Sequence, residues 1–207
     1  MSFYGSWFLP RLIGCACGSR PVARQRALLV PLARGVVVDL GFGSGTNLPF
    51  YDADRVSRVI AVEPDRAMLA YRRELRRPDI PVEEVVAGAE ATGLPDGCAD
   101  TVVVTYALCT IPDAPAALAE ARRLLKPGGQ LLFCEHGRAP DADVARWQAR
   151  IEPVWKRLAG GCHLTRDPVA LVQAAGFTCE ALEQRYLSGT PRFAGWTTRG
   201  TAVPAAG

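Results

Sequence analysis

The chain has 207 residues, of which 49% are hydrophobic and 22% are charged, and its formal net charge is +3. This length and composition predict a single domain (1–207) with a substantial core, and so mild a charge gives no electrostatic footprint for nucleic acid, which we therefore do not expect as a partner. No window approaches the run of about 20 apolar residues that a membrane-spanning helix needs.

The seven cysteines are odd in number and scattered, and most lie in apolar runs. This usage favours reduced thiols in a cytoplasmic protein over a disulfide framework. Cys15 and Cys17 have no second pair at zinc spacing, so we expect no metal site. The N-terminus has no basic region followed by a long apolar core, so we expect no signal peptide.

Residues 1–20 are rich in aromatic and aliphatic side chains and are interrupted by Pro10. Three interpretations of this amphipathic segment are open: a helix packed on the domain, a lid over the active site, or a contact with a membrane interface. The last would make the protein a peripheral membrane protein.

Apolar runs rich in β-branched residues alternate with helical patterns along the rest of the chain. We predict strands at 36–39, 59–63, 82–87, 101–105, 130–135, 177–184 and 193–203, and helices at 22–33, 65–76, 115–125, 143–158 and 168–175. Strands that alternate with helices predict an α/β fold with a doubly wound sheet. Such sheets bind their ligands beyond the carboxyl ends of the strands.

Three glycines, Gly41, Gly43 and Gly45, follow the first strand at every second position. Glycine can adopt a positive φ and has no Cβ, so a ligand can lie against bare backbone here. The exposed N–H groups favour a negatively charged group. Asp39, just before the loop, has an open role that includes simply bracing it. The loop predicts a nucleotide-like ligand.

Glu63 ends the second strand, 22 positions after Gly41. An acid at this place accepts hydrogen bonds from ribose hydroxyls. The glycine loop and this acid fit both NAD and S-adenosylmethionine. The chain lacks the separate catalytic domain of a two-domain dehydrogenase, and the later segments 87–91, 96–100 and 124–129 fit the methyl donor.

With these segments, residues 36–135 resemble the class I S-adenosylmethionine-dependent methyltransferases. The resemblance implies a Rossmann-like sheet of seven strands with the last strand antiparallel, and S-adenosyl-L-methionine as cofactor, with S-adenosyl-L-homocysteine as product. It implies that loop 41–45 holds the methionine part, that Glu63 holds the ribose, and that Ala89 and Glu90 flank the adenine. The family often has Asp or Ser where Gly88 stands, so we expect Glu90 to make the adenine contact. The expected cofactor-binding residues are Gly41, Phe42, Gly43, Gly45, Asn47, Leu48, Glu63, Pro64, Ala89, Glu90 and Tyr106.

The acceptor-side segment, 136–207, is similar to the animal membrane-associated thiol S-methyltransferases and their bacterial relatives. The similarity rests on Glu135-His136, 147–148, 152–155, 161–166 and 191–196. It implies a small-molecule methyl acceptor and favours a thiol. The alternatives are N-methylation of a phospholipid or small amine, O-methylation of a natural product, and a cofactor-binding protein without turnover. Those animal proteins begin with a hydrophobic anchor, which the short aromatic segment here replaces.

Three residues of this segment are candidates for catalysis or for contact with the acceptor. His136 follows the fifth predicted strand, at the edge of the sheet where the acceptor should lie, and could take the proton of a thiol. His163 and Arg166 share one run, and a cation there could lower the pKa of the acceptor thiol. For each of the three the alternative is a structural role.

Overall fold

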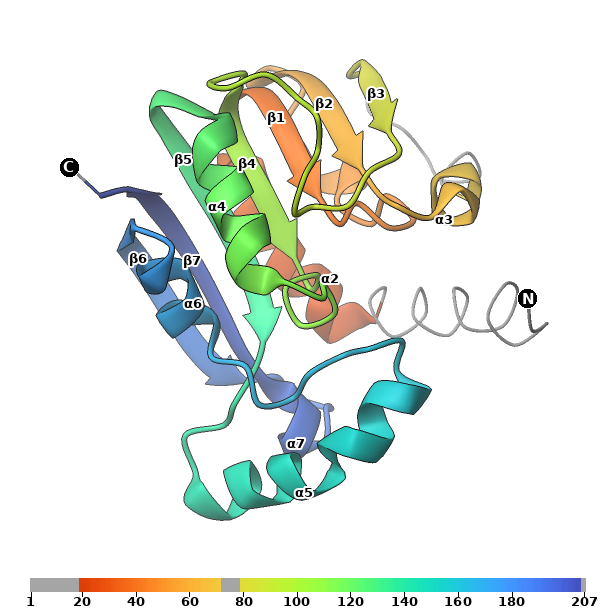
Figure 1. Cartoon of the computed structure of the whole chain (residues 1–207), viewed down its shortest axis with the longest axis vertical. Helices are drawn as coiled ribbons and strands as arrows, with labels where there is room; N and C mark the ends of the chain where they lie inside the picture. Colours follow the sequence, from red (N-terminus) through yellow and green to blue (C-terminus); the bar gives the residue numbers. More distant parts are fainter. Residues whose placement is uncertain (1–18, 72–78, 206–207) are drawn as a thin grey trace.

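The computed structural model describes residues 19–71 and 79–205. Its centre is a seven-stranded sheet in the order β3-β2-β1-β4-β5-β7-β6 (Figure 1). Neighbouring strands are parallel except at β7, which is antiparallel to both β5 and β6. The strands are β1 (Gly35–Leu40), β2 (Val56–Val62), β3 (Val82–Val85), β4 (Ala99–Thr105), β5 (Leu125–His136), β6 (Phe177–Tyr186) and β7 (Trp196–Pro204). The predicted α/β fold with an antiparallel last strand is confirmed.

Helices cover both faces of the sheet because its central strands are apolar on both sides. Val38 and Leu40 of β1 belong to the core cluster that includes α4 (Ala114–Leu124) and α6 (Pro168–Ala174). Val37, the neighbour of Val38 in β1, packs with α2 (Arg20–Leu29) and the 3-10 turn η2 (Val30–Leu32) on the opposite face. Figure 1 shows α4 and α6 in front of the sheet and α2 behind it.

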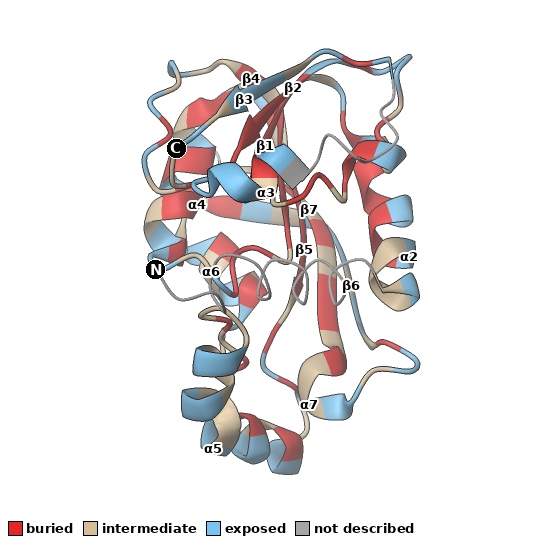
Figure 2. Cartoon of the chain, turned by 90° about the vertical axis from the view of Figure 1, so that its right-hand side faces the viewer, coloured by how far each residue is buried: buried red, intermediate tan, exposed pale blue. Residues whose placement is uncertain are grey.

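Two helices extend beyond the carboxyl ends of the parallel strands. α5 (Ala142–Leu158) and the short α7 (Arg192–Gly195) lie together at this end of the molecule (Figures 1 and 2). In Figure 2 the strands are mostly buried, whereas the outer face of α5 is exposed. No helix within residues 19–71 and 79–205 has both the length and the apolar character needed to span a bilayer.

The structure corrects several predicted boundaries. The predicted helix 115–125 and strand 130–135 left residues 126–129 outside both, but these residues lie within β5, where Leu125 already pairs with Ala99 and the register shifts before Gln130. Residues 192–195 are helical, so β7 starts three residues later than predicted. The short helix α3 (Arg66–Tyr71) begins after Asp65. The Asp65 carboxylate accepts the N–H of Ala67, as expected of a helix cap. The rest of the predicted helix 65–76 and most of segment 1–20 lie outside the described residues.

Candidate active site

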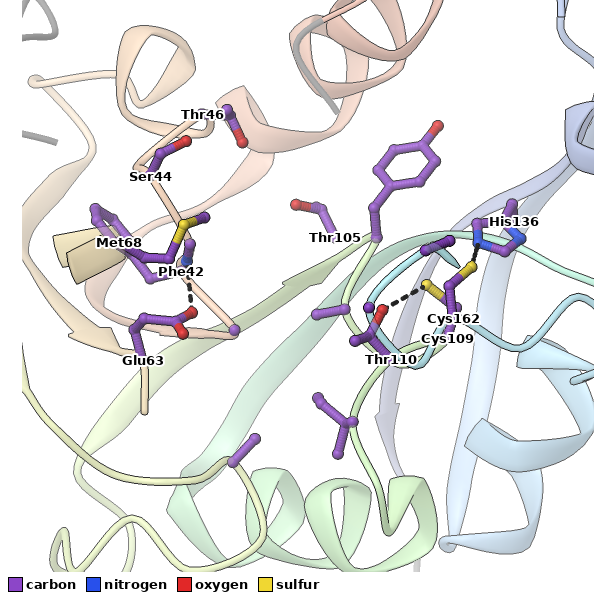
Figure 3. Close-up of a pocket in the computed structure, with 18 of the residues that line it drawn as sticks. Phe42, Ser44, Thr46, Glu63, Met68, Thr105, Cys109, Thr110, His136 and Cys162 are labelled. Atoms are coloured by element: carbon purple, nitrogen blue, oxygen red, sulfur yellow. Dashed lines mark hydrogen bonds between the residues drawn. The ribbon is translucent and has the colours of Figure 1, made fainter. Parts of the chain in front are cut away.

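A cavity of about 570 Å³ opens at the carboxyl ends of β1, β2, β4 and β5 (Figure 3). This volume suits a small molecule. The predicted site residues that line it are Gly41, Phe42, Gly43, Glu63, Pro64, Ala89, Glu90, Tyr106 and His136. The cavity thus lies where a doubly wound sheet is expected to bind its ligand.

The glycine loop brings bare backbone to the wall of this cavity. The N–H groups of Gly41 and Phe42 both donate to the carbonyl of Val62 at 3.0 Å, which ties the loop to β2. Gly41 has a φ of +71°, and a Cβ there would lie 2.5 Å from the Cβ of Ala107. Gly43 has a φ of +58°, and the nearest atom to its Cβ position, Met68 Cε, is 3.7 Å away. Packing therefore requires the first glycine, whereas the second leaves space for a ligand.

Glu63 stands at the end of β2 with both carboxylate oxygens anchored. Its Oε2 accepts the N–H of Gly43 at 2.8 Å, and its Oε1 accepts the N–H of Asp65 at 3.1 Å. Each oxygen can accept a further hydrogen bond. Burial raises the pKa of this carboxyl group above its ordinary value, although the two N–H donors oppose the shift. Glu63 is thus oriented to receive hydroxyl groups from the cavity.

Asn47, which was expected to bind the cofactor, belongs to a buried polar network next to the glycine loop. Asp39 accepts hydrogen bonds from Asn47 Nδ2 at 3.0 Å and from the Tyr51 hydroxyl at 2.8 Å. The Oδ1 of Asn47 accepts from Arg26 and from Thr105, both at 3.0 Å. Burial raises the pKa of Asp39 to about 6. Asp39 therefore braces the loop, and the side chain of Asn47 is committed to the network.

Gly45, Asn47 and Leu48 are not among the described residues that line the cavity. Leu48 is fully buried and packs in the core cluster on the face of the sheet that α2 covers. Its place is set by the 3-10 turn η3 (Leu48–Phe50), which continues from the glycine loop.

The segment after β3 forms the wall next to Glu63. A Cβ on Gly88 would lie 2.8 Å from Glu90 Oε2, so the Glu90 side chain occupies the space where another residue at 88 would extend. Glu90 Oε1 also accepts the N–H of Asp113 at 3.3 Å. The Glu90 carboxylate thus fills the space beside Gly88 in the cavity wall.

The loop after β4 is held from both sides. Glu135, which is fully buried, accepts the N–H groups of Ala107, Leu108 and Cys109 at 2.8, 3.0 and 3.4 Å. The Arg166 guanidinium donates to the carbonyls of Leu108, Ile111 and Pro112. These contacts fix the part of the cavity wall that carries Cys109 and Thr110.

Tyr106 opens this loop in an unusual conformation. Its φ of 53° makes it the only non-glycine among the described residues with a positive φ. The Arg26 guanidinium lies 5.1 Å from the centre of its ring. Strained backbone of this kind is frequent at functional sites, and here it turns the chain from β4 into the cavity wall.

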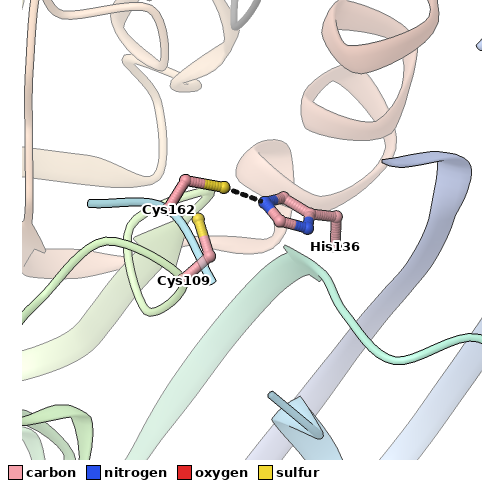
Figure 4. A group of neighbouring side chains, drawn as sticks. All are labelled: Cys109, His136 and Cys162. Carbon is pink, nitrogen blue, oxygen red and sulfur yellow. Dashed lines mark hydrogen bonds between the residues drawn. The ribbon is translucent and has the colours of Figure 1, made fainter. Parts of the chain in front are cut away.

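His136 lies at the far end of the cavity from Glu63, beside two cysteines (Figures 3 and 4). Its Nε2 is 3.1 Å from Cys162 Sγ, and Cys109 Sγ belongs to the same cluster. The pKa of His136 is raised above its ordinary value. Burial alone would lower it, but the contact with Cys162 and the negative charge of the Glu135 carboxylate have the larger effect. The neighbouring Cys109 thiol, together with burial, raises the pKa of Cys162.

His163 and Arg166 lie behind the cavity wall rather than on it. His163 Nδ1 is 3.3 Å from Glu152 Oε1, and its backbone N–H donates to the carbonyl of Cys109 at 2.7 Å. Burial and the positive charges of Arg166 and Lys156 lower the pKa of His163. Both residues contact the 108–112 loop, so the structure brings them near His136 without exposing them to the cavity.

Several lining residues were not predicted from the sequence: Arg26, Met68, Thr105, Cys109, Thr110, Trp155, Cys162 and Leu187. Cys162 adjoins His163 in a run that the sequence had singled out, and this adjacency was the available signal. Arg26 comes from α2, before the glycine loop, where no motif marks it.

Comparisons with known proteins agree with this geometry. A family model described as a methyltransferase domain matches residues 38–133. Thiol S-methyltransferase TMT1B of Rattus norvegicus is 34% identical over 152 residues, which are 71% of this chain and 62% of the relative. Ubiquinone/menaquinone biosynthesis C-methyltransferase UbiE of Acidiphilium cryptum is 33% identical over 115 residues, 54% of this chain and 46% of the relative. The chain thus spans less than two thirds of the length of these curated relatives.

Among solved structures, a chain from the complex between the Haloferax volcanii Trm112 methyltransferase activator and a methyltransferase has a TM-score of 0.73 at 16% identity. The match covers 98% of this chain and 96% of the other. At this identity the likeness concerns the fold alone.

Proposed function

Because the chain belongs to the class I S-adenosyl-L-methionine-dependent methyltransferases, we propose that it transfers the methyl group of this donor to a small-molecule thiol. The observation that carries the proposal is the cavity itself, which joins a glycine loop and Glu63 at one end to His136 and two cysteines at the other. S-adenosyl-L-methionine is the methyl donor of this family.

The donor end would hold the cofactor through backbone and carboxylate groups. The space beside Gly43 would take the methionine part, and the remaining acceptor capacity of Glu63 would bind the ribose hydroxyls. Ala89 and Glu90 would flank the adenine. The volume is of the order needed for a nucleoside together with a small acceptor.

The acceptor end favours an uncharged or thiol acceptor over a cationic amine. The acidic residues that line the cavity in the described part of the chain, Glu63, Asp65 and Glu90, come from the ends of β2 and β3, at the donor end. The acceptor end is formed by Cys109, Thr110, His136, Trp155, Cys162 and Leu187. Such a surface would not stabilise an ammonium group by an ion pair. The rat relative, which carries the name thiol S-methyltransferase, supports the same choice.

Methyl transfer is an in-line displacement at the methyl carbon of the sulfonium, so the protein mainly aligns the two sulfur atoms and excludes water. A thiol has a pKa of about 8.5, and only its thiolate is a good nucleophile. His136, at the acceptor end, would favour the thiolate. Arg166 and His163 would act through the 108–112 loop, as positioning residues.

The experiment is to incubate the purified full chain with the methyl donor and separate panels of simple thiols, primary amines and phenols. We expect S-methylated products and S-adenosyl-L-homocysteine with the thiols, at rates at least about tenfold above those with amines or phenols. The variant Glu63→Ala is the control for donor-dependent product. Products from amines or phenols with none from thiols would contradict the thiol assignment while leaving a methyltransferase.

We also propose a cytoplasmic location. The five cysteines of residues 19–71 and 79–205 (Cys98, Cys109, Cys134, Cys162 and Cys179) are free thiols, as a reducing compartment would leave them. A peripheral membrane contact would depend on segment 1–20. Co-sedimentation of the chain with anionic vesicles, with and without residues 2–17, tests that contact.

A further inference from the structure

Three side chains with metal-binding atoms meet at the acceptor end of the cavity (Figure 4). One atom from each of Cys109, His136 and Cys162 lies within 4.8 Å of the others, and His136 Nε2 is 3.1 Å from Cys162 Sγ. Around a tetrahedral zinc ion, sulfur and nitrogen ligands are about 3.5–3.8 Å from one another, as bond lengths of about 2.3 and 2.0 Å require. Side-chain shifts of about 1 Å would therefore suffice to enclose an ion.

The three residues come from different elements that are fixed relative to one another. Cys109 lies in the loop held by Glu135 and Arg166. His136 ends β5 and pairs with Thr197 of β7. The segment after α5 that carries Cys162 is tied to the same loop by the bond from His163 N–H to the Cys109 carbonyl. These contacts thus hold the three residues in fixed positions relative to one another, as a binding site of defined geometry requires.

Each sulfur also has a hydrogen-bond donor within reach. Trp155 Nε1 donates to Cys162 Sγ at 3.3 Å, and the Thr110 hydroxyl lies 3.5 Å from Cys109 Sγ. Donors of this kind stabilise coordinated thiolates and orient them. In His136, Nδ1 is buried without a partner among the described residues, and Nε2 faces the sulfur of Cys162. Nε2 is therefore the ring atom placed to bind an ion.

We propose that Cys109, His136 and Cys162 bind one Zn²⁺ ion whose fourth coordination position faces the cavity. Two thiolates and one imidazole suit zinc rather than the oxygen-seeking Mg²⁺ or Ca²⁺. Three protein ligands with an open position are the pattern of catalytic zinc, whereas structural zinc has four protein ligands. All three residues line the cavity, so a small molecule in it can reach the open position.

Taken with the proposed function, on which this step rests, the open position is where the acceptor sulfur binds. The acceptor thiol loses its proton to solvent water on coordination, since a coordinating thiol is deprotonated outright. The sulfur lone pair then forms a bond to the methyl carbon while the bond from that carbon to the sulfonium sulfur breaks, and its electron pair neutralises the sulfonium. No oxidation or reduction occurs. His136 acts here as a ligand and not as a base.

The first experiment is metal analysis of the full chain after reconstitution with one equivalent of zinc under reducing conditions and gel filtration. We expect about one zinc per chain, falling below about a tenth in Cys109→Ser and in Cys162→Ser. Cys179→Ser, in β6 and away from the cavity, is the matched control and should keep its zinc. Thermal unfolding followed by circular dichroism identifies any variant that has lost its fold. Less than about a tenth of an equivalent in the wild-type chain overturns the proposal.

The second experiment needs no variant. Cobalt(II) in place of zinc should give the visible and near-ultraviolet absorption of a tetrahedral site with thiolate ligands, and a simple thiol such as 2-mercaptoethanol should shift it by entering the open position. A cobalt complex without this absorption would refute the site. Cobalt that stays bound when Cys109 and Cys162 are joined in a disulfide would also refute it. Thiol methylation by metal-free protein would remove the zinc proposal and leave the proposed function. A tetrahedral cobalt spectrum from a protein that methylates no thiol would support the metal site and contradict the proposed thiol methylation.

Discussion

The carboxylate of Glu135 accepts the backbone N–H of Cys109 at 3.4 Å, from a position that is fully buried. The same carboxylate accepts the N–H groups of Ala107 and Leu108, so one side chain at the end of β5 holds the start of the loop after β4. Burial raises the pKa of Glu135, and the three donors oppose the shift. The loop therefore depends on one buried carboxylate that accepts three of its backbone N–H groups.

The first prediction concerns this anchor. In Glu135→Gln the new amide group places N–H donors against at least one backbone N–H, so we expect a loss of about 2–4 kcal/mol in the free energy of unfolding. We also expect turnover to fall more than donor affinity, because the displaced loop carries Cys109. Urea unfolding and calorimetric titration with S-adenosyl-L-homocysteine measure the two quantities. Glu180→Gln, on the exposed face of β6, should change neither. Unchanged turnover in a folded Glu135→Gln protein would contradict the argument.

Gly43 and Gly97 form a pair that separates strain from ligand contact. Their φ angles are +58° and +59°, so alanine at either place costs about 1–2 kcal/mol of stability. No atom lies within 4 Å of the Cβ position of Gly97, which is away from the cavity. We expect Gly43→Ala to lower donor affinity by at least about tenfold and Gly97→Ala to leave it unchanged. Gly43→Val should abolish donor binding. Full donor affinity in Gly43→Val, measured by calorimetry, would place the donor elsewhere.

Glu63 predicts how donor binding depends on pH. In the proposed site the ionised carboxylate would accept the ribose hydroxyls, and its raised pKa means that protonation begins at a higher pH than the ordinary value of 4.5. Donor affinity should therefore be full at neutral pH and should fall as the pH drops through this pKa, by up to about tenfold per unit. Glu63→Gln should bind about 10–100-fold more weakly at neutral pH and lose this acid limb. An acid limb that persists in Glu63→Gln would assign it to another group.

Asp39 predicts a stability that decreases with rising pH. Its pKa is raised from 3.8 to about 6 in the folded protein, so the folded state holds this proton more tightly than the unfolded state does. The stabilisation is present below the unfolded pKa and is lost as the pH rises through the folded one. Relative to Asp39→Asn, the wild type should lose about 2 kcal/mol of unfolding free energy between about pH 4 and pH 7. Asp54→Asn, at an exposed position, should follow the wild type. Parallel curves for wild type and Asp39→Asn would contradict the shift.

The fold, and the position of the glycine loop and Glu63 on one cavity, could be predicted from the sequence because their signals are local. Runs of β-branched residues gave the central strands, and a glycine loop after one strand with an acid after the next gave the two ends of the expected donor site. The same reasoning included Asn47 and Leu48, because both follow the glycines. The side chain of Asn47 instead joins Asp39, Arg26 and Thr105, a contact between segments that sequence spacing does not reveal.

The acceptor end could be predicted only as a set of candidates. His136 was placed at the correct edge, but its neighbours Cys109 and Cys162 lie 27 and 26 residues away on other elements, and no periodicity links them. Arg166 was considered as an acceptor contact, whereas its guanidinium donates to three loop carbonyls. Such long-range pairings follow from the strand order, which the sequence does not specify residue by residue.

The reversed direction of β7 has a practical consequence for attaching this protein to a surface. Because β7 starts beside His136 and ends beside Phe177, its last residue lies at the end of the sheet opposite the cavity. The segment before β7, which includes α7, contributes Leu187, Thr190 and Ala194 to the cavity wall. A tag joined after the last strand would leave the entrance open to solvent. A tag inserted at 187–195 would obstruct it.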